Sequence, residues 1–161
     1  MSEIRIYPDS ILRGKAIPLE NVDSKAKKMV DDMIMTMHSH KGIGLAAPQI
    51  GLLLKVIVVN SEHGVTPLIN PEILESEGEI VGEEGCLSVP EVTVNVSRAL
   101  HILIRGVDLA EREVEFETSG LLARVFQHEV DHLEGKLIID HITRLKRSLI
   151  KSRLKKRAHC R

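Results

Sequence analysis

The chain has 161 residues and a formal net charge of −1, and 43% of its residues are hydrophobic. This length and composition favour one globular domain and exclude a disordered chain. Two cysteines are too few for a disulfide framework, and two Phe, one Tyr and no Trp leave little for stacking on nucleic-acid bases. No segment has the pattern of a signal peptide or a membrane span, so we expect a cytoplasmic, membrane-free single domain over residues 1–161.

The first predicted element is a helix. Asp23 or Ser24 is a suitable cap, and apolar residues three and four positions apart follow from Ala26 to Met37. This spacing places the apolar side chains on one face of a helix, which we expect to end by Gly42.

Strands are predicted in the middle of the chain. Residues 54–59 form a nearly continuous apolar run, which is typical of a buried strand. Residues 92–96 and 100–104 alternate apolar with other side chains, the pattern of half-buried strands, and residues 114–118 could pair with them.

Two further helices are predicted. One runs from Ser119, a suitable cap, to Gly135, a suitable C-terminal stop, and the other covers roughly residues 143–157. Four apolar side chains are expected on one side of the last helix: Leu145, Leu149, Ile150 and Leu154. The pattern predicts an α+β fold with antiparallel or mixed sheets around the central helix, plus a C-terminal helix.

The sharpest functional signal is His128-Glu129-Val130-Asp131-His132 within the predicted central helix. Residues four apart share one helix face, so both imidazoles can bind one ion. Glu129 flanks them and can reach a water on that ion. The spacing is typical of a hydrolytic metal site, and the alternative is an exposed helix face that carries two histidines.

The position of the third ligand decides the kind of site. A metzincin requires histidine at position 138, which is Ile138, and His141 comes three residues too late. A thermolysin-like site requires a later glutamate, and none follows Glu134. The candidates are therefore Cys86, at a turn bounded by Gly and Pro, and Cys160 in the tail. Cys86 would leave a fourth position for water, and its alternative role is a small buried apolar residue.

Three motifs resemble the signatures of peptide deformylases, and they occur in that family's order. They are Gly42-Ile43-Gly44-Leu45-Ala46-Ala47-Pro48-Gln49, Glu84-Gly85-Cys86-Leu87-Ser88 and Gln127-His128-Glu129-Val130-Asp131-His132-Leu133-Glu134-Gly135. The resemblance covers nearly the whole chain and corresponds to the compact form of many bacterial enzymes. The first motif lacks the third glycine of a dinucleotide loop, so no nucleotide cofactor is expected.

This resemblance implies removal of the formyl group from the N-terminal formyl-methionine of new polypeptides. The implied metal ligands are Cys86, His128 and His132. Glu129 would handle the proton, and the Gln49 side-chain amide and the Leu87 backbone N–H would stabilise the oxyanion. Fe(II) is the implied physiological ion, although Zn, Ni or Co also suits these ligands. Asp131 and Arg98 are candidates for supporting contacts around the ligands.

The resemblance also implies a binding site for N-formylmethionyl peptides. Ile43, Leu121 and Val125 match the wall of the methionine pocket, although an ordinary place in the core is the alternative for each. Backbone at Gly44 and Gly85 is expected to pair with the extended substrate.

A basic segment closes the chain. Residues 143–161 contain nine Lys or Arg and no acidic residue, so the preceding residues carry a net charge of −10. The simple interpretation is a solvated helix packed by its leucines. The functional interpretation is transient contact with the ribosome, with which the family's C-terminal helix is associated. We expect deletion of residues 148–161 to weaken ribosome binding and to spare activity on a short formyl-peptide.

Two other functions fit parts of the sequence. A zinc endopeptidase would cleave unformylated peptides internally, but its downstream ligand is missing. A non-catalytic ribosome- or nucleic-acid-binding protein with structural zinc would favour four protein ligands, and three are credible here.

Overall fold

The computed structural model describes residues 1–160, with side chains described for residues 1–157. The candidate ligand Cys160 therefore lies outside the described side chains. With η for short 3-10 helices, the elements are η1 (Ser10–Arg13), α1 (Ser24–Ser39), β1 (Gly44–Ala46), η2 (Ala47–Ile50), β2 (Val56–Ser61), β3 (Gly64–Glu77), β4 (Ile80–Cys86), β5 (Val89–Arg98), β6 (His101–Val107), β7 (Glu113–Ser119), α2 (Gly120–Leu133), η3 (Ile138–His141) and α3 (Arg144–Cys160).

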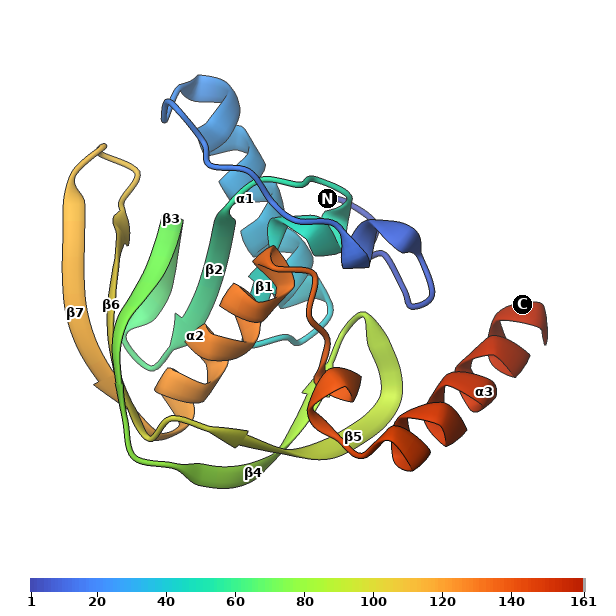
Figure 1. The fold of residues 1–161 in the computed structure, drawn as a ribbon. Helices are drawn as coiled ribbons and strands as arrows, with labels where there is room; N and C mark the ends of the chain where they lie inside the picture. The colour runs from blue at the N-terminus through green and yellow to red at the C-terminus, as the bar shows by residue number, and fades with distance from the viewer. Residues whose placement is uncertain (161) are drawn as a thin grey trace.

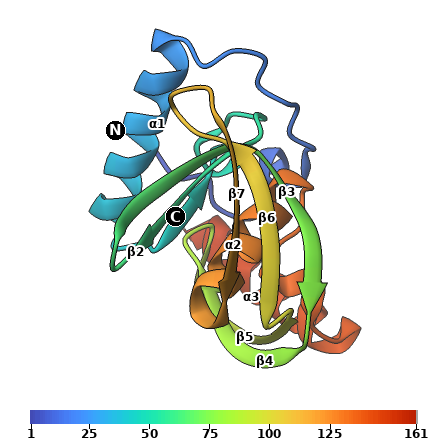
Figure 2. The same ribbon diagram turned by 90° about the vertical axis from the view of Figure 1, so that its left-hand side faces the viewer.

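Two antiparallel sheets lie around α2, and they confirm the predicted α+β class (Figure 1). The larger sheet has the strand order β1-β2-β3-β6-β7, and the smaller one pairs β4 with β5. Strand β3 extends beyond its pairing with β2, which ends at Ile69, stays paired with β6 as far as Glu77, and then leads into β4 (Figure 2). The predicted pairing of residues 100–104 with 114–118 is confirmed, because β6 pairs with β7 along its whole length.

Strand β2 is buried on both faces, which explains its continuous apolar sequence. Successive side chains of a strand point to opposite faces. Val56 and Val58 belong to the core beneath α1, whereas Ile57 and Val59 belong to the core that contains Phe126 of α2. Each fully buried aliphatic side chain contributes about 1.5–3 kcal/mol. The two helices are therefore held on opposite faces of the same strand.

The ends of the two buried helices follow their local sequence. The Asp23 carboxylate caps α1 by accepting a hydrogen bond of 2.9 Å from the Ala26 N–H. Ser119 occupies the predicted cap position of α2, but its side chain makes no capping hydrogen bond. Gly135 follows α2 with a φ of 74°, and a Cβ there would lie 2.6 Å from the Arg13 carbonyl oxygen. Both the positive φ and the closeness of the Arg13 carbonyl oxygen require glycine at the end of this helix.

The last helix buries fewer apolar side chains than its sequence predicts. Ile150 and Leu154 pack into a core with β5 and η3, but Leu145 and Leu149 are 71% and 64% exposed. Leu145 and Leu149 form one row along the helix, and Ile150 and Leu154 form another. Because neighbours in sequence are about 100° apart around a helix, a helix that packs through one row leaves the other exposed. Helix α3 packs against the rest of the protein through a single row of side chains and projects away from it (Figure 1). None of the described helices combines the length and apolar character needed to cross a membrane.

Candidate metal centre

Three side chains of types that can bind a metal come together from two elements. Cys86 ends β4, and His128 and His132 lie one turn apart on α2. One ligand atom from each lies within 4.8 Å of the other two, and no second group of this kind occurs among the described residues. The register of the β4–β5 hairpin shifts between Gly85 and Cys86. Such a bulge re-aims a side chain, and here it accompanies the approach of Cys86 to α2.

The donor atoms fit a divalent metal ion. His128 donates from Nδ1 to Glu84 Oε1 over 2.9 Å, which leaves its Nε2 for a metal. His132 Nε2 lies 3.4 Å from Cys86 Sγ. Burial holds the pKa of His132 well below its ordinary value, so this imidazole is neutral and can act as a ligand. One thiolate and two imidazoles suit several first-row metals and leave a position open.

A buried carboxylate supports His128 from behind. Glu84 Oε1 accepts hydrogen bonds from His128 and Arg98, and Glu84 Oε2 accepts from Arg98 and Arg124, all at 2.7–2.9 Å. Burial raises the pKa of Glu84, but the hydrogen bonds from Arg98 and His128 outweigh it and hold the pKa well below its usual range. Arg98 also donates to Asp131 over 2.6 Å.

These contacts give Arg98 and Asp131 the named partners that the sequence alone did not provide. Glu84 and Arg124 were not predicted as parts of the site. One signal for Arg124 is present in the sequence, since it is a charged residue one turn before His128 in a largely apolar helix. Glu84 offers no comparable signal except its place in the second motif.

Glu129 is a buried carboxyl group beside the candidate ligands. Its side chain is 5% exposed, and its Oε1 lies 3.8 Å from His128 Nε2. Its Oε2 is buried without a hydrogen-bond partner. Burial raises the pKa of Glu129 to about 7. A carboxyl group with a pKa near neutrality can both accept a proton and return it.

Gln49 is held rigidly next to the cysteine. Its Oε1 accepts a hydrogen bond of 3.0 Å from the Ala46 N–H, and its Nε2 donates to Ser88 Oγ over 3.1 Å. The same Nε2 lies 3.7 Å from Cys86 Sγ. Leu87 lies in the turn between β4 and β5 and borders the same space. The Gln49 amide is therefore a donor placed before any substrate arrives.

A cleft of about 940 Å³ opens in front of these groups. The predicted site residues that line it are Ile43, Gly44, Gln49, Gly85, Cys86, Leu87, Leu121, Val125, His128 and Glu129. His132 is buried behind them. Ile43 and Leu121 are 52% and 70% exposed at the cleft, so they are not ordinary core residues, whereas Val125 is buried and also packs in the core.

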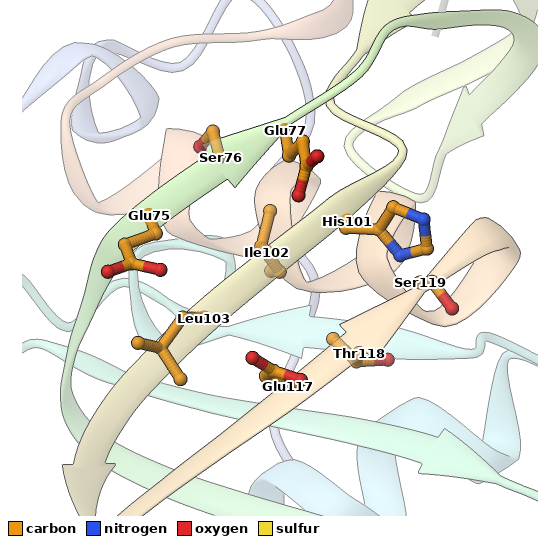
Figure 3. A pocket seen from close by; sticks show the side chains of 9 residues that line it. All are labelled: Glu75, Ser76, Glu77, His101, Ile102, Leu103, Glu117, Thr118 and Ser119. Carbon is orange, nitrogen blue, oxygen red and sulfur yellow. The ribbon is translucent and has the colours of Figure 1, made fainter.

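A smaller hollow of about 300 Å³ lies on β3, β6 and β7 (Figure 3). Glu75, Glu77, His101 and Glu117 are among its lining residues. It shares no lining residue with the cleft and contains none of the predicted site residues. The sequence-based site therefore lies at the cleft and not at this hollow.

The fold and the cleft define a metal-dependent hydrolase of the His-Glu-x-x-His type, with a cysteine as the candidate third ligand. Residues 1–148 match the model of the polypeptide deformylase family. The chain belongs to this family, and the predicted resemblance is confirmed.

Individual relatives agree along almost the entire length. The peptide deformylase of Thermodesulfovibrio yellowstonii is 46% identical over 158 residues, which are 95% of this chain and 96% of the relative. A crystal structure of a peptide deformylase from Legionella pneumophila matches 99% of this chain and 96% of its own, with 38% identity and a TM-score of 0.93. The peptide deformylase from Ehrlichia chaffeensis in complex with actinonin covers 98% of both chains at 34% identity and a TM-score of 0.93.

Proposed function

We infer that the cleft is the place where this enzyme, a peptide deformylase, removes the formyl group from the amino terminus of nascent polypeptides. The observation that carries this assignment is the convergence of three ligand atoms within 4.8 Å beside the buried Glu129 carboxyl. The products of the hydrolysis are formate and a free amino terminus.

The proposed metal ligands are Cys86 Sγ, His128 Nε2 and His132 Nε2. We propose Fe(II) as the physiological ion, and Zn, Ni or Co also suits one thiolate with two imidazoles. An ion held there would act as a Lewis acid and lower the pKa of water, which falls from 15.7 to about 7 in zinc sites.

The chain's own groups manage the proton and the developing charge. Glu129 accepts a proton from the attacking water, since its Oε2 has no other hydrogen-bond partner, and later passes this proton to the departing amine. The Gln49 Nε2–H and the Leu87 backbone N–H are proposed to donate to the oxyanion that forms from the formyl carbonyl. Loss of one such donor typically raises the barrier by about 3–4 kcal/mol.

The methionine side chain of the substrate is proposed to lie against Val125, with Ile43 and Leu121 at the mouth of the cleft. The substrate backbone is expected to pair with the chain at Gly44 and Gly85, which both line the cleft. Backbone pairing carries little side-chain information, so residues after methionine are weakly selected. Actinonin, which binds the Ehrlichia chaffeensis enzyme, is expected to compete for the same cleft.

The test is formate release from formyl-Met-Ala-Ser by protein purified without oxygen, with the bound metal measured on the same sample. Glu129→Ala is expected to abolish turnover while leaving bound metal in place. Glu134→Ala is the matched control, because this exposed glutamate follows the end of the same helix. Bound metal without formate release by the wild type would overturn the assignment. Activity that survives in Glu129→Ala would overturn the role of this residue alone.

We propose that residues 1–161 act as one catalytic domain in the cytoplasm, where nascent polypeptides emerge, and that α3 makes a transient contact with the ribosome. Support comes from the concentration of positive charge on α3. Because Ile150 and Leu154 of this helix are buried, deletion of residues 148–161 would also remove part of the core. Charge substitutions on the exposed side of α3 therefore give a cleaner test than deletion.

The ribosome test changes three exposed basic residues to glutamate: Arg153, Lys155 and Lys156. Co-sedimentation with ribosomes is expected to fall and to depend on salt, while formate release from the tripeptide stays unchanged. The matched control carries the same change at three exposed lysines of α1: Lys25, Lys27 and Lys28. Equal loss of binding in both variants would contradict a specific role for α3.

A further inference from the structure

The carboxylate of Glu84 has all its accepting positions filled. A carboxylate offers about four lone-pair sites, and Glu84 receives four hydrogen bonds. Arg98 supplies two of them, His128 one and Arg124 one. The Arg124 Nη1 bond is the shortest of the four at 2.7 Å. Glu84 is therefore fixed in the one orientation that presents Oε1 to the His128 imidazole.

The Arg124 side chain is itself buried and donates three hydrogen bonds. It is 7% exposed, and besides Glu84 it donates to the Val96 carbonyl oxygen over 2.8 Å and to the Ile80 carbonyl oxygen over 2.7 Å. These partners lie on both strands of the smaller sheet. One guanidinium thus fastens β4 and β5 to α2 immediately behind the candidate ligands.

Space for this guanidinium depends on a glycine of β4. A Cβ at Gly82 would lie 3.1 Å from Arg124 Cζ and 3.2 Å from both Nε and Nη2. The guanidinium is held by three hydrogen bonds and has little freedom to retreat. Gly82 has no unusual backbone angle, so the contact with Arg124 is the structural reason for glycine at this position.

We propose that Arg124 is a positioning residue for the metal centre, which acts through Glu84 on His128. Arg124 and His128 are one turn apart on α2, and Glu84 bridges their side chains, so the helix backbone and two hydrogen bonds form a closed ring. This ring sets the direction of His128 Nε2 relative to Cys86 and His132. The proposal rests on the proposed ligand set. Arg124 borders the cleft, but none of its hydrogen bonds goes to Cys86, His128 or His132.

The experiment compares Arg124→Met, Arg124→Lys and Gly82→Ala with the wild type, each loaded with Co(II). Three quantities are measured: the rate of cobalt loss to a chelator, the visible spectrum of the cobalt–thiolate centre, and kcat and KM for formyl-Met-Ala-Ser. Arg105→Met is the matched control, because Arg105 is a partly exposed arginine paired with Glu72 and Glu113 on the larger sheet.

Arg124→Met is expected to lose cobalt about 10- to 100-fold faster than the wild type, the usual range for groups that support a metal ligand. Its spectrum should shift and its kcat should fall, with KM changed by less than about threefold. Arg124→Lys restores one charged hydrogen bond and should recover part of the loss. Gly82→Ala, which removes no polar atom, should move the same quantities in the same direction by a smaller factor.

Wild-type cobalt loss and spectrum in folded Arg124→Met would overturn the proposal, as would an equal effect in Arg105→Met. If Arg124→Met does not fold, Gly82→Ala and Arg124→Lys decide, and wild-type behaviour in both would also overturn it. Failure of the proposed function is distinguishable, because it appears as absent formate release in the wild type. The cobalt measurements do not depend on turnover.

Discussion

Replacement of Gly44 by alanine would bring a methyl group against the carboxyl group of Glu129, the proposed proton acceptor. A Cβ at this position would lie 2.9 Å from Val125 Cγ1 and 3.0 Å from Glu129 Cγ and Oε1. Contacts this short force one neighbour to move. Val125 is packed in the core, whereas no hydrogen bond holds Glu129 Oε2. Both side chains must therefore give way, and Glu129 shifts more readily because its Oε2 has no hydrogen-bond partner.

The size of the effect follows from this displacement. Over-packing of this kind costs about 1–3 kcal/mol of stability. A catalytic group misplaced by about 1 Å loses roughly 10²-fold in rate, which corresponds to about 2.7 kcal/mol in the barrier. We expect Gly44→Ala to keep its metal, because no candidate ligand is touched. The contacts with Glu129 are relieved by a shift of a few tenths of an ångström, so formate release should be slower than in the wild type by a factor of up to about 10².

The control is Gly106→Ala, which over-packs the larger sheet away from the cleft. A Cβ at Gly106 would lie 2.6 Å from the Leu68 side chain. This variant should lose comparable or greater stability, with kcat of the folded protein unchanged. A kcat within twofold of the wild type in metal-loaded Gly44→Ala would refute the argument that Gly44 leaves room for Glu129.

Three further predictions concern stability. Phe126→Ala should lower the free energy of unfolding by about 3–5 kcal/mol in urea denaturation, because this buried ring packs edge-on against Phe116. Arg13→Met should cost about 1 kcal/mol at pH 7. Burial raises the pKa of Asp140, but the hydrogen bonds from Arg13 and the Leu137 N–H, together with the charges of Arg13 and Arg147, outweigh it and hold the pKa below 3.8. The Arg13 contribution is therefore present above that value and should shrink as denaturation is repeated near pH 3. Asp23→Ala should lower the thermal midpoint through loss of about 1 kcal/mol of helix capping.

Local sequence patterns predicted most of the elements, because periodicity and capping act over a few residues. The start of α1 after Asp23 and the pairing of β6 with β7 are examples. The long strand β3 was not predicted as a unit. Its register against β6 shifts twice between Ile69 and Glu75, and such irregularities break the two-residue alternation that identifies a strand. The exposure of Leu149 was also not predictable, since apolar periodicity does not show which row of apolar side chains on a helix packs against the rest of the protein.

In the candidate site, too, some features follow from the local sequence and others only from the tertiary structure. The spacing of His128 and His132 on one helix already places two imidazoles on one face. The nearness of Cys86 depends on the hairpin that carries it to α2, and no local pattern encodes a contact over such a separation. The supporting role of Arg124 likewise appears only when its acceptors on β4 and β5 are in place.

By itself, the sequence determined the helix that carries the histidine pair, the absence of the downstream ligand that a metzincin or thermolysin-like site requires, and the three motifs that resemble the family's signatures. These properties depend on residue identity and on short-range geometry. Tertiary structure alone decided that Cys86 meets those histidines, that burial raises the pKa of Glu129 to about 7, and that Glu84 is saturated by Arg98, Arg124 and His128. The physical reason is that burial, desolvation and hydrogen bonds between distant elements exist only after the sheets have closed around α2.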